Sequence, residues 1–100
     1  MARTLWVVRR RRGEPWDWSR DLPEQDGWDE HAAIMDAMVE DGFILLGGPL
    51  EGDREVLHIV RAESKDAVHA RLAEDNWTRN GMLETVSVEG WTILLDGLRR

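Results

Sequence analysis

The sequence predicts an α+β fold of the ferredoxin-like kind, with a four-stranded antiparallel sheet and two helices on one face. Two segments place apolar residues at helical spacing. Four others are rich in β-branched and aromatic residues, which is typical of strands. In chain order these segments alternate as β-α-β-β-α-β: 4–8, 28–42, 43–46, 54–61, 65–73 and 85–95. One hundred residues suffice for one core, so a single domain over residues 1–100 is expected.

The composition argues against several classes of protein. A net charge of −7 speaks against nucleic-acid binding, because an acidic surface repels the phosphate backbone. No apolar run is long enough to span a membrane, and no signal-peptide layout precedes the first strand. The lack of cysteine excludes disulfides and thiolate metal sites and fits a cytoplasmic protein. Six tryptophans are more than a small core demands, so some are expected to line a pocket or an interface.

The first strand, Thr4 to Val8, is apolar at odd and even positions, so both of its faces are expected to be covered. The basic run Arg9 to Arg12 follows it. Four arginines in an acidic chain are a weak signal for nucleic acid. A solvated strand end is the expected structure there.

Residues 13–26 form a loop without helical or strand periodicity, and this loop is long for a compact domain. Trp16 and Trp18 flank Asp17 in it. Two interpretations stay open: one tryptophan caps the edge of the core, or the loop is a lid over a pocket. Under the second interpretation Trp16 and Trp18 bind substrate.

The stretch from Trp28 to Leu50 is the centre of the predicted fold. The apolar arc of its helix consists of Trp28, His31, Ala32, Met35, Met38, Val39 and Gly42. Gly42 ends the helix, because glycine readily adopts the left-handed conformation. The buried strand Phe43 to Leu46 follows. Gly47-Gly48-Pro49 stops this strand where the backbone can approach a ligand closely, so Gly48 and Pro49 are candidate substrate-binding residues.

The second half of the chain begins with a hairpin. Glu51-Gly52-Asp53 makes a turn, so the strands that flank it are expected to pair antiparallel. Ser64 is the expected N-cap of the second helix, whose narrow apolar stripe is Val68 and Leu72. In the last strand the apolar residues change parity near Glu89-Gly90, where a β-bulge is expected.

Two helices can cover only one face of the predicted sheet, although three of its strands are apolar on both faces. An uncovered apolar face of that size favours association. The expected solution is a two-fold homodimer that packs sheet on sheet, which is a dimeric α+β barrel.

The chain resembles the YCII-related family over essentially its whole length. The residues that carry the resemblance are EHAAIMDAM, DGFILLGGPL, AEDNWTRNGM and TVSVEGWTILL. The resemblance implies a dimeric α+β barrel and a His–Asp pair as the active site, here His31 and Asp75. Relatives on this barrel include muconolactone isomerase-like and dehalogenase-like enzymes and heme-free monooxygenases. Two departures bear on the pocket: Asp75-Asn76-Trp77 lacks the family's usual proline, and the 13–26 loop is longer than in the smallest members.

The residues themselves leave the roles of His31 and Asp75 open. A histidine on an apolar helix face is more often a packed core residue than a catalyst. A buried imidazole needs a polar partner, however, and none lies one turn away on this helix. Asp75 extends the stripe of the second helix and is the best candidate partner, although it also suits the N-cap of a short helical turn. If the two meet, the carboxylate orients the imidazole for general acid–base chemistry.

Two function classes follow. The first is a small-molecule enzyme of lyase, isomerase or dehalogenase type, in which His31 and Asp75 move protons. The second is a non-catalytic dimeric module that binds a small ligand or a protein partner. Trp77, beside Asp75, joins the substrate-binding candidates. His58 on the third strand is placed to reach a pocket, but the three histidines lack metal-ligand spacing and no phosphate loop occurs, so neither a metal nor a cofactor is expected.

Overall fold

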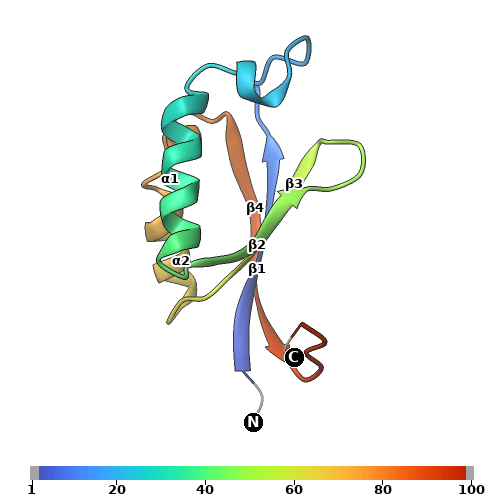
Figure 1. Cartoon of the computed structure of the whole chain (residues 1–100), viewed down its shortest axis with the longest axis vertical. Helices are drawn as coiled ribbons and strands as arrows, with labels where there is room; N and C mark the ends of the chain where they lie inside the picture. Colours follow the sequence, from blue (N-terminus) through green and yellow to red (C-terminus); the bar gives the residue numbers. More distant parts are fainter. Residues whose placement is uncertain (1–2, 99–100) are drawn as a thin grey trace.

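The computed structural model describes residues 3–98 and has the predicted ferredoxin-like α+β fold. Helices α1 and α2 lie on one side of the sheet (Figure 1). The elements are β1 (Arg3–Arg12), the 3-10 helix η1 (Leu22–Glu24), α1 (Trp28–Glu40), β2 (Ile44–Pro49), β3 (Glu55–Val60), α2 (Lys65–Leu72), α3 (Asn76–Arg79) and β4 (Leu83–Ile93). The predicted order of elements is confirmed, with the short helix α3 added before β4. Among residues 3–98 no helix has the length and apolar character that crossing a membrane requires.

The sheet order is β2-β3-β1-β4, and all neighbouring strands are antiparallel. The predicted hairpin of β2 and β3 is confirmed. At the centre of the sheet Val8 of β1 faces His58 of β3 on one side and Val88 of β4 on the other. Side chains of β1 and β3 that point toward the helices therefore lie in the middle of the covered face.

The helix boundaries follow local signals, of which Gly42 and Ser64 were predicted. Gly27 and Gly42 flank α1 with φ angles of +78° and +88°, a region that favours glycine. Ser64 is the N-cap of α2, since its hydroxyl accepts a hydrogen bond of 3.1 Å from the backbone N–H of Ala67. Val68 and Leu72 are buried in the core beneath this helix, as their spacing predicted.

The basic run at the end of β1 alternates between the two faces of the sheet. Arg9 and Arg11 are exposed and form ion pairs with glutamates of β3 and β4. Arg10 is completely buried on the helix face, and the side chain of Arg12 is only 4% exposed. The prediction of a solvated strand end is wrong for Arg10 and Arg12, because successive strand residues point to opposite faces.

The predicted bulge at Glu89–Gly90 is also wrong in position. The pairing of β4 with β1 shifts earlier, where Val86 is left out of the register. Val88 then faces the helices and Trp91 the opposite side by ordinary alternation, so no irregularity is needed between them.

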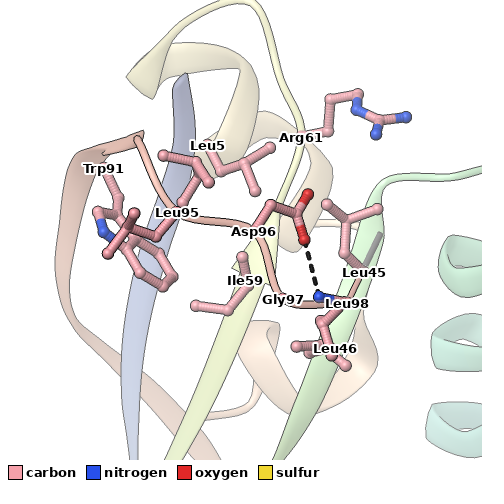
Figure 2. A pocket seen from close by; sticks show the side chains of 11 residues that line it. Leu5, Leu45, Leu46, Ile59, Arg61, Trp91, Leu95, Asp96, Gly97 and Leu98 are labelled. Carbon is pink, nitrogen blue, oxygen red and sulfur yellow. Dashed lines mark hydrogen bonds between the residues drawn. The ribbon is translucent and has the colours of Figure 1, made fainter. Parts of the chain in front are cut away.

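The sheet face opposite the helices is apolar as well. It carries Leu5, Val7, Leu57, Ile59 and Trp91. The segment after β4 lies over one end of this face, where Leu95 and Leu98 approach it (Figure 2). Trp91 remains 47% exposed. The structure therefore keeps a large apolar surface that the two helices do not cover.

Candidate active site

His31 and Asp75 meet near the N-terminal end of α1. The Nδ1 atom of His31 lies 2.7 Å from Oδ1 of Asp75, a hydrogen-bond distance. Both residues are buried, and their contact joins positions 44 residues apart in the chain. Asp75 is also the N-cap of α3, since Oδ1 accepts a hydrogen bond of 3.2 Å from the backbone N–H of Trp77. The two interpretations of Asp75 made from the sequence are therefore compatible.

The second oxygen of Asp75 faces a buried arginine. Nη1 of Arg10 lies 3.5 Å from Oδ2, and both side chains are fully enclosed. Thr78 donates its hydroxyl to the same oxygen at 3.3 Å and accepts a hydrogen bond from Nη2 of Arg10. Nη2 also donates to the carbonyl of Leu83 at 3.3 Å. Arg10 thus links β1 to both α3 and β4 through the site.

The surroundings keep Asp75 ionised at neutral pH. Burial by itself raises the pKa of a carboxyl group. Other groups oppose the effect of burial, and together they lower the pKa of Asp75 below its ordinary value. They are the hydrogen bond of His31 and its charge when protonated, the N–H of Trp77 and the charge of Arg10. A carboxylate therefore stands against Nδ1 of His31, which favours a proton on that nitrogen.

A group of tryptophans holds the imidazole in place. Trp77 stacks on the ring of His31 with 3.9 Å between centroids and an interplanar angle of 11°. Trp77 is itself fully buried and donates its indole N–H to the carbonyl of Asp26 at 2.8 Å. Trp16 packs edge-on against Trp77 at 5.6 Å. This packing fixes the plane of the imidazole, which is the preorganisation that proton transfer requires.

The ring of His31 lines a cavity of about 210 Å³ between α1 and the sheet. Its Nε2 atom makes no hydrogen bond within residues 3–98, so it is available to a molecule in the cavity. Cavities of about 150 Å³ accept benzene, so this one fits a single ring with small substituents. The walls are mostly apolar and consist of Arg12, Leu22, Trp28, His31, Met35, Val39, Ile44, Gly47, Gly48, Pro49, Val56, His58 and Leu83.

A larger cavity of about 420 Å³ lies on the opposite sheet face (Figure 2). Leucines, Ile59 and Trp91 make up most of its wall, and its charged residues are Arg61 and Asp96. It contains no histidine. The cavity at His31 is smaller, but it contains the titratable groups that a proton-transfer site needs.

The other predicted ligand-binding residues fall into two sets. Gly48 and Pro49 line the cavity with His31. The three tryptophans are not part of its wall. Trp77 stacks on the ring of His31. Trp16 is buried, and the guanidinium of Arg12 lies 3.9 Å from the centroid of its ring. Trp18 is 55% exposed. The 13–26 loop contributes Leu22 to the wall instead.

His58 is a second histidine in the same cavity. It is 6% exposed, and its Nδ1 atom is buried without a hydrogen-bond partner. Burial lowers its pKa to about 4, and the charge of Arg10, together with that of His31 when protonated, acts in the same direction. His58 is therefore neutral at physiological pH. No group of three histidine, cysteine or carboxylate side chains within residues 3–98 is arranged to hold a metal ion.

Stability should fall as the pH decreases from about 6.5 to about 4. In this interval the unfolded chain binds a proton at His58 and the folded chain does not. The part of the free energy of unfolding that is linked to neutral His58 is therefore fully present above pH 6.5 and is lost toward pH 4. The difference between the two pKa values corresponds to about 3 kcal/mol. Denaturant titrations between pH 4.5 and 7 should show this loss in the wild type and in a variant of the exposed His69, His69→Leu. They should show much less of it in His58→Leu, and an equal loss in all three proteins would contradict the assignment.

Comparison with known proteins agrees with this architecture. A family model described as the YCII-related domain matches residues 18–92. A solved structure with the same fold is the 5-chloro-2-hydroxyhydroquinone dehydrochlorinase of Burkholderia phenoliruptrix in complex with 2,5-dihydroxybenzoquinone, with a TM-score of 0.59 and 21% sequence identity. The similarity covers 86% of this chain and 90% of the dehydrochlorinase chain. No curated protein sequence matches the chain.

Proposed function

The chain belongs to the YCII-related domain family, and we propose that it is a small-molecule enzyme that moves protons with His31 and Asp75. One observation carries the proposal. The imidazole of His31 is bound through Nδ1 to a buried carboxylate at 2.7 Å, and the same ring lines a cavity. One nitrogen is thereby fixed, and the other is left for a substrate.

The proposed chemistry is general base catalysis by Nε2 of His31. Nδ1 of His31 donates its proton in a hydrogen bond to Asp75, so the lone pair of Nε2 points away from Asp75. This lone pair takes a proton from an O–H or C–H group of the substrate, and the carboxylate stabilises the imidazolium that forms. The electron pair of the broken bond moves into the substrate and expels a leaving group or shifts a double bond. His31 then returns the proton to water or to the product.

The cavity favours a substrate with one ring. Its volume of about 210 Å³ and its apolar walls suit a flat molecule with a few oxygen or halogen substituents. The structural neighbour is a dehydrochlorinase of a chlorinated hydroxyhydroquinone. We therefore place the reaction among eliminations and isomerisations of hydroxylated rings. For an elimination of HCl, His31 takes the proton and chloride leaves with the bonding electrons.

The experiment that tests the function is an assay of wild type and His31→Ala side by side. The compounds are 5-chloro-2-hydroxyhydroquinone and related chlorinated hydroquinones, and the readout is chloride release. Conversion by the wild type that is absent in a folded His31→Ala protein supports the proposal.

The alternative is a non-catalytic binding module. A histidine that is fully packed and hydrogen-bonded to the backbone would favour this alternative. His31 instead pairs with a carboxylate and borders a cavity, and this arrangement supports the enzyme.

We also propose a homodimer through the sheet face opposite the helices. Trp91 is 47% exposed on this face and Leu46 is 55% exposed. Leu57 and Val7 lie between them at half burial. A contiguous apolar face of this kind marks an association surface, and a second copy of the same sheet is complementary to it by two-fold symmetry.

Light scattering at micromolar concentration should give twice the mass of the chain for the wild type. Trp91→Glu should be a monomer, because a carboxylate within an apolar interface would be buried without a partner. Trp18→Glu is the matched control, since Trp18 is similarly exposed but lies in the 13–26 loop beside Arg54 and not among the apolar residues of this face, and it should remain a dimer. A monomeric wild type would refute the dimer.

A further inference from the structure

We propose that His58 is a second ligand-binding residue of the cavity, which donates a hydrogen bond from Nε2 to an oxygen atom of a phenol, enol or quinone substrate. The inference rests on the proposed function in placing the ligand beside His31. It adds a specific role for a second histidine and a chemical requirement on the substrate, namely an oxygen atom that accepts a hydrogen bond.

The position of His58 in the sheet brings it to His31. His58 lies on β3 opposite Val8 of β1 and Gly47 of β2, in the middle of the face that α1 covers. Both His58 and His31 line the cavity of about 210 Å³. Besides these two rings, the polar side chain in the wall is that of Arg12, whose Nη2 is held by Asp53 at 2.8 Å. A ligand in this cavity therefore meets two imidazoles among apolar side chains.

The hydrogen-bonding pattern indicates which nitrogen of His58 carries the proton. Nδ1 is buried and has no hydrogen-bond partner. A buried N–H without an acceptor is rarer than a buried acceptor without a donor, which favours a bare Nδ1 and a proton on Nε2. Nε2 lies on the side of the ring next to Gly47, which also borders the cavity. The proton of the neutral ring is thus on the side that a ligand can reach.

Gly47 leaves room for this ring. A Cβ atom at position 47 would lie 2.8 Å from Cδ2 and 3.4 Å from Nε2 of His58, and the first distance is too short for any side chain. The absence of a side chain at Gly47 gives the imidazole room beside β2, and both residues line the cavity.

Burial and the charges around His58 keep the ring neutral. Burial disfavours a positive charge most strongly, Arg10 and protonated His31 disfavour it as well, and Asp75 favours it less strongly. With a pKa of about 4, His58 neither takes protons from the substrate nor becomes a cation between pH 5.5 and 8. The two histidines have different tasks. His31 receives the proton, and His58 stabilises the negative charge that develops on the substrate oxygen.

Nitrogen-15 NMR of the histidines tests the donor form in the wild type without a ligand. His58 should be neutral, with its proton on Nε2, from pH 5.5 to 8. The same spectrum should then change at His58 Nε2 when 2,5-dihydroxybenzoquinone is added. A neutral ring with its proton on Nδ1 would overturn the proposal before any variant is made.

Titration calorimetry with 2,5-dihydroxybenzoquinone, phenol and toluene tests the hydrogen bond itself. His58→Leu should weaken binding of 2,5-dihydroxybenzoquinone and phenol about tenfold, because these two compounds lose a hydrogen bond. Its affinity for toluene should stay within about threefold of the wild-type affinity. His58→Gln, which retains an N–H donor, should bind within about threefold of the wild type. His69→Gln, on the exposed face of α2, is the control and should match the wild type.

The outcomes separate this proposal from the proposed function. Equal affinity of His58→Leu and wild type for the quinone contradicts the role of His58, and so does a wild type that binds none of the three compounds. Suppose that quinone binding depends on His58 and that chloride release does not depend on His31. This result would contradict the role of His31 as the base and would support the role of His58 as the hydrogen-bond donor.

Discussion

Replacing Arg10 with methionine is expected to lower the free energy of unfolding by about 3 kcal/mol. Methionine keeps the apolar stem but removes the guanidinium that contacts Asp75, Thr78 and the carbonyl of Leu83. The Asp75 carboxylate is then left fully buried, with the imidazole of His31 as its remaining ion-pair partner only when that ring is protonated. Loss of one partner of a buried ion pair costs more than loss of an exposed one, because the other charge has no water to replace it.

Arg11→Met is the matched control for this change. Arg11 is the next residue of the same strand, and its side chain is 59% exposed beside Glu84. Its loss should change stability by about 0.5 kcal/mol or less, since exposed ion pairs contribute little. Denaturant titrations at pH 7 measure both variants. Similar losses for Arg10→Met and Arg11→Met would contradict the structural role assigned to Arg10.

Replacing Asp75 with asparagine is expected to lower the rate of proton transfer by about 10²- to 10⁴-fold. Asparagine has nearly the same shape but no charge, and its amide group can donate to Nδ1 of His31. The imidazole proton then moves to Nε2, and the nitrogen that faces the cavity can no longer accept a proton. An analogous change in the serine-protease triad lowers kcat by about 10⁴ through the wrong tautomer.

The measurement is the rate of chloride release together with a thermal melt. Asp41→Asn is the control, because Asp41 is exposed at the far end of α1 and pairs with Arg71. This control should keep the wild-type rate. An Asp75→Asn protein that also works at the wild-type rate would show that the carboxylate has no part in positioning His31.

The periodicity of the sequence was sufficient for the fold. The helical arc around His31, the Ser64 cap and the turn between β2 and β3 are local signals, and each appears in the structure, although Val39 of the arc is 56% exposed. The contact of His31 with Asp75 was also within reach, because a polar residue in each of two facing apolar stripes needs a partner.

Arg10 and His58 depend on information that is not local. Arg10 belongs to a basic run that is expected to be exposed. It is buried because it points to the same face of β1 as Val8, two residues earlier, which is a core residue. This alternation was present in the sequence, but the charge of the run obscured it. His58 reaches the cavity only because β3 pairs between β1 and β2, which places it under α1. The strand order decides this, and no short motif encodes it.

The tryptophans of the 13–26 loop show a further limit. Trp16 and Trp18 are two residues apart and look equivalent in the sequence. One is buried against Trp77 and Arg12, and the other is half-exposed beside Arg54. The backbone of an irregular loop sets these directions, and periodicity gives no information about it.

The most direct test of the central claim is chloride release by wild type and His31→Ala on 5-chloro-2-hydroxyhydroquinone, with a thermal melt of each protein. We expect conversion by the wild type and loss of conversion in a His31→Ala protein whose melt shows that it is folded. Undiminished conversion by folded His31→Ala would contradict the assignment of His31 as the base.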